Sequence, residues 1–299
     1  MKHITVLQQE AVNALNLKKD SVVVDCTLGS GGHAETILSL LGAKGIYIGI
    51  DVDASAIKAN EHLQEHTKAK VILIEDNFRF IKDVLANVGV QQPQAILADL
   101  GWRMEQFDGT AGELRGFSFN REEPLAMTYG LSKEYAFNAY DIVNDWKEED
   151  IANVIYAYGQ ERYSRRIAKR IVETREQSPI CTSFELAAVV EAAYPKMRGR
   201  KKIHPATKTF QALRIAVNDE FDALKALVLD GYDCLTPHGR MSIISFHSLE
   251  ARIVKETFRT FTRDQKAVLV NKKPLTASDE ELQANPRARS AKLRTIEKM

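Results

Sequence analysis

The sequence predicts an α/β protein with a doubly wound, mostly parallel Rossmann-like sheet and an inserted helical domain. Short runs that are apolar throughout alternate with helical segments over the first hundred residues, as expected for parallel strands covered on both faces. Strand-like runs return near residue 240, after a long helical stretch. The simplest architecture is one sheet from which the chain departs after the fourth strand, forms helices and then returns.

Four strands and three helices account for the first part of the chain. Each expected strand is a short apolar run, and each helix has apolar residues at helical spacing. Right-handed crossovers between parallel strands then place helices on both faces of the sheet. We expect strands at 21–25, 45–50, 71–74 and 95–98, and helices at 34–41, 54–64 and 80–87.

The remaining elements are mostly helical before the sheet resumes. We expect helices at 134–142, 148–158, 161–176, 183–193, 220–229 and 249–261, and strands at 240–245, 267–270 and 292–296. The pattern suggests that residues 1–108 and 213–299 form the sheet domain. Residues 109–212 would then form the inserted helical domain.

Composition excludes several classes of protein. The hydrophobic fraction of 44% is ordinary for a globular chain, and no apolar run approaches the ~20 residues needed to cross a bilayer. The first residues have no signal-peptide pattern. The three cysteines are scattered, without a C-x-x-C pair, so we expect neither a disulfide framework nor a metal site. We expect a cytoplasmic protein.

Charge is distributed unevenly although the formal net charge is +1. Residues 1–160 hold 14 Lys and Arg against 23 Asp and Glu, whereas residues 161–215 hold 13 against 5. Residues 285–299 hold 5 against 1. Basic blocks beside an acidic half suggest a polyanionic partner. The alternative interpretation is a solvated helical face.

A glycine-rich turn follows the first expected strand. The run from Gly29 to Ala34 fits G-x-G-x-x-A, and Asp51 lies twenty residues after Gly31, at the end of the second strand. Glycines allow a ligand to approach the backbone closely, and a helix N-terminus offers N–H groups to an anion. The carboxylate of Asp51 is suited to ribose hydroxyls. The pattern predicts a nucleoside-bearing cofactor, either NAD or S-adenosylmethionine (SAM), so an NAD-dependent oxidoreductase is one alternative.

Two later strand ends favour SAM. Asp76 and Phe78 follow the third strand, where they offer a polar side chain and an aromatic edge to an adenine. Asp99 ends the fourth strand, and a carboxylate suits a sulfonium and a methyl acceptor better than it suits hydride transfer. For Asp76 and Asp99, capping of a loop is the alternative role.

Several long blocks carry a resemblance that runs nearly from end to end. The blocks include Gly29–His33, Asp99–Gly101, Arg115–Phe119, Tyr158–Tyr163, His204–Arg214, Ser242–Glu250 and Asn285–Ser290. They resemble the RsmH or MraW family of SAM-dependent methyltransferases, which methylate the exocyclic N4 of a cytosine in 16S ribosomal RNA. The resemblance implies a SAM pocket lined by Gly31, Gly32, His33, Asp51, Phe78, Asp99 and Gln106.

The resemblance also implies the chemistry and the partner. A cytosine amino group is a poor nucleophile, so a group that accepts its N–H proton assists attack, and Asp99 is the candidate catalytic residue. Methylation at cytosine C5 would instead require a cysteine nucleophile, and none is suitably placed. Trp102 is expected either to stack on a flipped base or to pack in the core. The partner would be 16S ribosomal RNA within the small ribosomal subunit.

Two segments depart from the family pattern. Residues 102–105 (Trp-Arg-Met-Glu) replace a small or aliphatic residue followed by two serines, and Ala126 and Thr128 replace the acid and the base of Pro-Leu-Asp-Met-Arg. We prefer a divergent member with the same substrate, because the basic blocks are intact. A non-catalytic SAM- and RNA-binding assembly protein is the other alternative.

Basic side chains near residue 200 are suited to phosphate contacts, because Lys supplies charge and Arg forks onto phosphate oxygens. A second cluster, on a helix starting near Arg162, fits either RNA contact or a solvated face. The candidate RNA-binding residues are Arg200, Lys201, Lys202, His204, Lys208 and Arg214.

His247 follows the fifth strand. For this residue, a structural role with a hydrogen bond to the backbone is favoured over a position facing the bound ligand.

Overall fold

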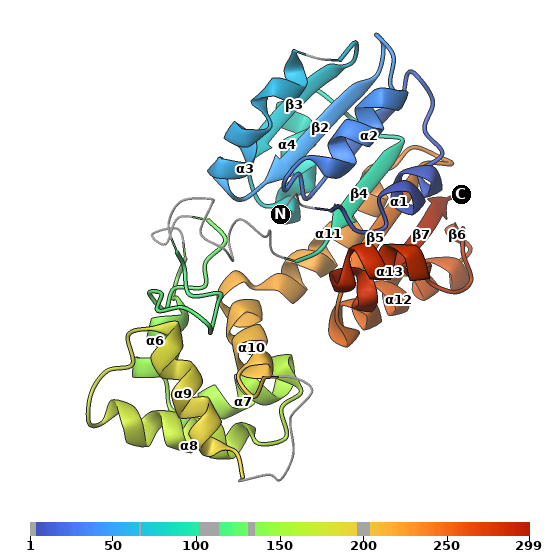
Figure 1. Ribbon diagram of the computed structural model, residues 1–299. Helices are drawn as coiled ribbons and strands as arrows, with labels where there is room; N and C mark the ends of the chain where they lie inside the picture. Colours follow the sequence, from blue (N-terminus) through green and yellow to red (C-terminus); the bar gives the residue numbers. More distant parts are fainter. Residues whose placement is uncertain (1–3, 66, 102–113, 131–134, 196–203) are drawn as a thin grey trace. The chain divides into compact units, whose positions relative to one another are not determined.

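The computed structural model describes residues 4–65, 67–101, 114–130, 135–195 and 204–299. The chain divides into two compact units (Figure 1). We call Met1–Arg103 with Phe221–Met299 the sheet unit, and Met104–Glu220 the helical unit. The return to the sheet unit comes later than the expected 212/213 junction, which falls inside helix α10 (Thr207–Asn218). This helix packs against α7 (Glu148–Gly159) and so belongs to the helical unit.

The sheet unit contains a seven-stranded sheet with the order β3-β2-β1-β4-β5-β7-β6. The first five strands in this order are parallel, and β7 pairs antiparallel with both β5 and β6. The predicted doubly wound, mostly parallel sheet is therefore confirmed. The strands are β1 (Val22–Asp25), β2 (Ile46–Asp51), β3 (Lys70–Glu75), β4 (Ala95–Asp99), β5 (Arg240–Ser245), β6 (Ala267–Leu269) and β7 (Lys292–Lys298).

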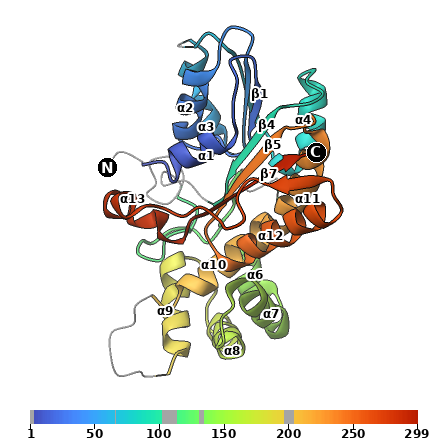
Figure 2. The ribbon, with the colours of Figure 1, turned by 90° about the vertical axis from the view of Figure 1, so that its right-hand side faces the viewer.

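Helices cover both faces of this sheet because its strand residues are apolar on both sides. Val23 and Leu97 point into one core cluster, whereas Val24 and Ile96 point into the other. Helices α1 (Gln8–Ala14), α2 (Gly32–Leu40) and α3 (Ala54–Ala59) contribute to the first cluster. Helices α4 (Ile81–Asn87), α11 (Glu220–Cys234) and α12 (Ser248–Arg263) contribute to the second (Figure 2).

Several short elements differ from the expectation. Helices α1, α10 and α13 (Asp279–Ala284) were not expected as helices. The expected helix at 54–64 divides into α3 and a 3₁₀ turn, η1 (Glu61–Gln64), because Asn60 turns inward and is buried. Two further 3₁₀ turns are η2 (Phe78–Phe80) and η4 (Pro286–Ser290).

The helical unit has a core of its own. Its helices are α6 (Ala139–Asp145), α7, α8 (Ser164–Arg175), α9 (Ser183–Ala193) and α10. Capping boxes begin two of them: Asn138 with Asp141 starts α6, and Thr182 with Glu185 starts α9, which satisfies helix N–H groups that lack intrahelical acceptors. In the described part of the chain, no helix is long and apolar enough to span a membrane.

Candidate active site

Three acidic residues end neighbouring strands of the sheet unit. Asp25, Asp51 and Asp99 are the last residues of β1, β2 and β4. Strands β2 and β3 lie on one side of β1, and β4 lies on the other. Ligands of doubly wound sheets bind at the carboxyl ends of the strands, where the strand order reverses. The acids therefore mark the edge at which a cofactor is expected.

The glycine turn after β1 is fixed by Asp51. The N–H of Gly29 donates to Oδ2 of Asp51 at 2.9 Å, and the N–H of Asp53 donates to Oδ1 at 2.9 Å. Each carboxylate oxygen can accept more than one hydrogen bond. Asp51 thus holds the turn in place at the strand ends, and its binding of ribose hydroxyls stays a prediction from the sequence.

Gly31 requires the absence of a side chain for two reasons. Its φ of 82° is unfavourable for other residues, and an added Cβ would lie 2.0 Å from Oδ1 of Asn60. Asn60 in turn donates from Nδ2 to the carbonyls of Gly29 (3.0 Å) and Ala56 (2.8 Å). The turn and the end of α3 therefore form one interlocked structure.

Helix α2 begins at Gly32, directly after this turn. The first N–H groups of a helix have no intrahelical acceptor and favour negative charge. The side-chain amide of Gln8 holds this helical turn from α1, donating to the carbonyl of Gly32 (2.7 Å) and to Oγ1 of Thr36 (2.8 Å). Gly32 therefore contributes backbone close to the strand ends, and its place in the SAM pocket stays a prediction.

His33 contributes its side chain as well as its backbone. The ring is buried, and its Nε2 lies 3.5 Å from Oδ2 of Asp99. Burial lowers the pKa of His33, but Asp99 and Asp25 outweigh it, and the net shift of this pKa is upward. The imidazole thus links α2 to the end of β4.

Asp25 lies beneath this pair and is fully buried. It accepts a hydrogen bond from the hydroxyl of Tyr47 (2.9 Å) and another from the N–H of Thr27 (3.2 Å). Burial raises the pKa of Asp25, and the charge of His33 opposes this shift. The sequence analysis did not single out Asp25, although its position after an apolar strand is the same signal that marked Asp51 and Asp99.

Three buried polar atoms of this cluster have no hydrogen-bond partner in the part of the chain that the structure describes. Oδ1 of Asp99 and both ring nitrogens of His33 have no hydrogen-bond partner among the described residues, although Nε2 lies 3.5 Å from Oδ2 of Asp99. The backbone N–H of Asp99 donates to Oγ1 of Thr27 at 2.7 Å, which fixes the strand end. Because buried polar groups are rarely left unpaired, these atoms indicate that a polar ligand completes the site.

The residues that follow β3 supply a loop-capping carboxylate and an aromatic ring. The carboxylate of Asp76 accepts the N–H of Asn77 at 2.6 Å, which is the loop-capping role, and Asn77 caps η2. Phe78 is half-buried at the start of η2 and packs against the core. Gln106 and residues 102–105, including Trp102, lie outside the described residues.

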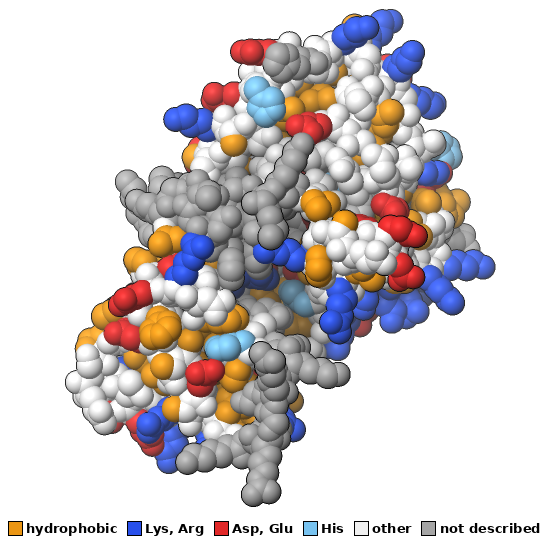
Figure 3. Space-filling model, viewed as in Figure 1, with side chains coloured by type: hydrophobic (Ala, Val, Ile, Leu, Met, Phe, Trp, Pro, Cys, Tyr) orange, Lys and Arg blue, Asp and Glu red, His pale blue; other side chains and the backbone are white. Residues whose placement is uncertain are grey.

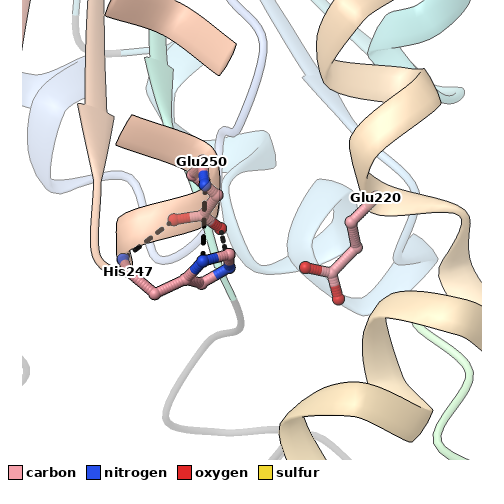
Figure 4. Close-up of side chains that lie close together, drawn as sticks. All are labelled: Glu220, His247 and Glu250. Carbon is pink, nitrogen blue, oxygen red and sulfur yellow. Dashed lines mark hydrogen bonds and ion pairs between the residues drawn. The ribbon is translucent and has the colours of Figure 1, made fainter. Parts of the chain in front are cut away.

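His247 has the structural role favoured from the sequence. Its Nδ1 accepts the N–H of Glu250 (3.4 Å), its Nε2 lies 3.0 Å from Oε1 of Glu250, and the two residues form the capping box of α12 (Figure 4). The ring is thereby held at the end of β5 as part of the helix start.

The predicted RNA-binding residues of the helical unit divide into different environments. Lys208 is exposed, with its Nζ 3.0 Å from the carbonyl of Gln160. His204 stacks on Phe119 with ring centroids 4.4 Å apart, and its Nε2 lies 3.0 Å from Oε1 of Glu191. Arg200, Lys201 and Lys202 lie outside the described residues.

Arg214 is held within the helical unit. Its Nε and Nη2 donate to the two carboxylate oxygens of Glu220 at 2.7 and 2.9 Å, and both side chains are only 11% exposed. This bidentate geometry matches a planar guanidinium to a carboxylate. The guanidinium is therefore occupied by Glu220, which leaves Arg214 poorly suited to a phosphate contact.

The second basic cluster lies on an exposed face of α8, as its spacing predicted. Arg165 donates to Oδ1 of Asn153 (3.2 Å), and Lys169 and Arg170 form ion pairs with Glu173. Exposed pairs of this kind contribute little to stability.

Comparison with known proteins assigns the chain to a family. The profile described as the MraW methylase family matches residues 1–299. The chain belongs to the MraW methylase family. It is 44% identical over 313 residues to a protein of Brevibacillus brevis named ribosomal RNA small subunit methyltransferase H, covering 99% of this chain and 98% of the relative. A protein of Paenibacillus with the same name is 41% identical over 320 residues, covering 100% and 99%.

Among solved structures, an rRNA methylase from Streptococcus thermophilus matches over 99% of each chain, with 13% identity and a TM-score of 0.44.

Membership of the MraW methylase family decides between the two cofactors and excludes the NAD-dependent oxidoreductase. SAM is the cofactor of this chain. The site fits it: a glycine turn approaches the strand ends, Asp51 is suited to a ribose, and Nδ1 of His33, which has no hydrogen-bond partner among the described residues, is suited to the polar end of the cofactor. Asp25 and Asn60 are the residues of this site that the sequence analysis missed.

Proposed function

We propose that this MraW methylase transfers the methyl group of SAM to the exocyclic N4 of a cytidine in 16S ribosomal RNA of the small ribosomal subunit, in the cytoplasm. The observation that carries the ribosomal substrate is the likeness to the two relatives named ribosomal RNA small subunit methyltransferase H, which extends over 99% or more of the chain.

The cysteines support an amino group over ring carbon C5 as the acceptor. Covalent attack at the cytosine ring requires a thiolate beside the base. Cys26 is fully buried, and this burial raises its pKa well above the ordinary value. Cys234 ends helix α11, and Cys181 is an exposed residue of the helical unit. None is an available thiolate at the ends of β4 or β5.

Asp99 is the candidate catalytic residue. SAM supplies an activated methyl group, so the protein must align the acceptor and exclude water. The Oδ1 of Asp99 lacks a hydrogen-bond partner among described residues, whereas Oδ2 faces His33. Oδ1 is therefore suited to accept an N–H of the cytosine amino group, which makes the nitrogen lone pair more available and receives its proton. His33 holds the Asp99 carboxylate in place.

The RNA would be held by cationic side chains. The exposed Lys208 and the predicted contacts Arg200, Lys201 and Lys202 supply charge, and the His204 ring on Phe119 supplies a flat surface on which a base can stack. Arg214 is left out of this set because Glu220 occupies its guanidinium.

The test uses small ribosomal subunits that lack the modification. The protein is incubated with them and with SAM carrying a tritiated methyl group, and the RNA is then digested for mass spectrometry. We expect label in 16S RNA as N4-methylcytidine. The Asp99→Asn variant should retain most SAM binding and lose most methyl transfer.

Three other outcomes have defined meanings. Label at C5 of cytosine would overturn the assignment of the amino group. Label in another RNA would overturn the ribosomal substrate. SAM binding without label in any RNA would favour the alternative of a non-catalytic assembly protein. The replacement of the family's acid and base by Ala126 and Thr128 is the sequence feature that raises this alternative.

A further inference from the structure

Three cationic side chains of the sheet unit lie at the edge that holds the candidate active site. We call Arg287, Arg289 and Lys292 the basic edge. The pairing register places them: Asp99 of β4 pairs with Ile244 of β5, and Ile244 pairs with Leu293 of β7. Because β7 runs antiparallel to β5, its first residue, Lys292, lies at the carboxyl ends of the parallel strands. The basic edge is thus two strands away from Asp99, or about 10 Å at the usual spacing between strands.

The local structure turns these cations outward. Asn285 begins the 3₁₀ turn η4, accepting the N–H of Arg287 on Oδ1 (3.3 Å) and donating from Nδ2 to the carbonyl of Ile4 (3.0 Å). Ala288 and Ala291 are buried in the core of the sheet unit. Arg287, Arg289 and Lys292, which flank them, are exposed. Small residues anchor the turn, so the long cationic side chains are not needed for packing.

Acidic neighbours do not neutralise the basic edge. Its three residues form no ion pair with any residue that the structure describes. Glu297, the sole acid among residues 285–299, pairs with Arg240 at 2.8 Å. Glu281 of the acidic helix α13 accepts the N–H of Leu7 at 2.7 Å. Figure 3 shows Lys and Arg side chains gathered next to this helix.

Positive charge continues along the same strand. Arg294 is half-buried, and its Nε has no hydrogen-bond partner among the described residues. Burial lowers the pKa of Arg294, and the nearby charge of Arg259 on α12 lowers it further. Two arginines that repel one another without an acid between them raise the affinity of this surface for an anion.

We propose that the basic edge binds the phosphate backbone of the RNA substrate beside the reacting base. This assignment rests on the proposed function and adds a second RNA contact, on the sheet unit itself. The guanidinium of arginine can donate two parallel hydrogen bonds to phosphate oxygens. Phosphate contacts position a nucleic acid without recognising its sequence. Because the sheet unit carries both the basic edge and Asp99, the contact fixes the RNA strand relative to the methyl donor independently of the helical unit.

The test compares two variants with equal loss of charge. The first is Arg287→Gln/Arg289→Gln/Lys292→Gln. The matched control is Lys18→Gln/Lys19→Gln/Lys44→Gln, which removes three exposed cations from the loops before β1 and β2, at the opposite edge of the sheet. The measurements are SAM affinity by calorimetry and the affinity for a fluorescein-labelled 16S RNA transcript and for unmodified small subunits at several salt concentrations.

We expect both variants to bind SAM as the unaltered protein does. The basic-edge variant should bind RNA roughly tenfold more weakly at low salt, and the slope of log affinity against log salt should fall by about two, since each phosphate contact contributes about 0.7 to 0.9. The control should keep the slope. The single variants Arg287→Gln and Arg289→Gln, which disturb the fold least, should each reduce the slope by nearly one.

Failure of this assignment differs from failure of the proposed function. If the unaltered protein binds and methylates 16S RNA and the basic-edge variants keep the slope of the control, the basic edge is not an RNA contact. If the unaltered protein neither binds nor methylates 16S RNA in transcripts or subunits, the proposed function falls, and this inference with it.

Discussion

The Nε2 of His33, in the first turn of α2, lies 3.5 Å from Oδ2 of Asp99, the last residue of β4. This pair spans the point where the strand order of the sheet reverses. It couples the protonation of a buried imidazole to the carboxylate that we assign to proton acceptance. The glycine turn, the helix start and the candidate catalytic residue are therefore one connected structure.

The first prediction concerns the pH dependence of this pair. The pKa of His33 is raised above its ordinary value of 6.5, so the folded protein binds this proton more tightly than the unfolded chain. The resulting stabilisation is fully present below pH 6.5 and is lost as the pH rises through the folded-state pKa. Urea unfolding should therefore show that His33→Gln costs more stability at about pH 6 than at about pH 8.5.

A second measurement assigns the cause. In Asp99→Asn, the pKa of the His33 ring, followed by NMR, should fall. A ring whose pKa is the same in both proteins would show that Asp99 is not the partner that raises it.

The second prediction concerns Asp51. Asp51→Ala removes an acceptor for ribose hydroxyls and for the N–H of Gly29, so SAM should bind about ten- to a hundredfold more weakly, as expected when a hydrogen bond of roughly 1.5–3 kcal/mol to a charged group is lost. Asp51→Asn, which keeps one acceptor, should lose less. Calorimetry with Asp83→Asn, an exposed acid of α4, provides the control and should match the unaltered protein.

The third prediction separates backbone strain from collision in the glycine turn. Gly31 and Gly89 have φ values of 82° and 72°, but only at Gly31 does an added Cβ meet a neighbour. Gly89→Ala should cost about 1 kcal/mol of unfolding free energy from the left-handed backbone alone. Gly31→Ala should cost clearly more, and adding Asn60→Ala should recover part of the difference. Equal losses in the two single variants would contradict the clash with Asn60.

The fourth prediction concerns Arg214. Its bidentate pair with Glu220 is largely buried, and removing one partner of a buried pair costs roughly 3 kcal/mol. Arg214→Gln should therefore lower stability to urea while leaving the salt dependence of RNA binding unchanged. Lys208→Gln is the matched comparison: it should leave stability unchanged and reduce the salt slope by nearly one. If Arg214→Gln reduced the slope of log RNA affinity against log salt concentration, Arg214 would be an RNA contact after all.

The sequence predicted the sheet and the position of the site for physical reasons. The strands are recognisable in the sequence as continuous apolar runs because helices cover both faces of the sheet. Acids such as Asp51 and Asp99 are recognisable because they directly follow such runs. The glycine turn was recognisable because Gly31 has a local reason to be glycine.

Other parts depend on contacts that spacing does not show. Asn60 reaches the turn only because α3 ends beside it, and Asp25 acquires its partner from the neighbouring strand, at Tyr47. Arg214 belongs to a basic block in the sequence, yet the end of α10 brings it to Glu220. A charge count detects such a residue without revealing that it is already paired.

The adjacency of β4 and β5 has a consequence for the kinetics of folding. Asp99 pairs with Ile244 although the whole helical unit, Met104–Glu220, intervenes in the chain. Closing so long a loop is entropically unfavourable while that loop is disordered. The helical unit has its own apolar core, so we expect that folding of this unit first would shorten the effective loop and speed the pairing of β4 with β5. Substitutions that loosen the core of the helical unit should therefore slow the pairing of β4 with β5 during refolding, without changing any residue of the candidate active site.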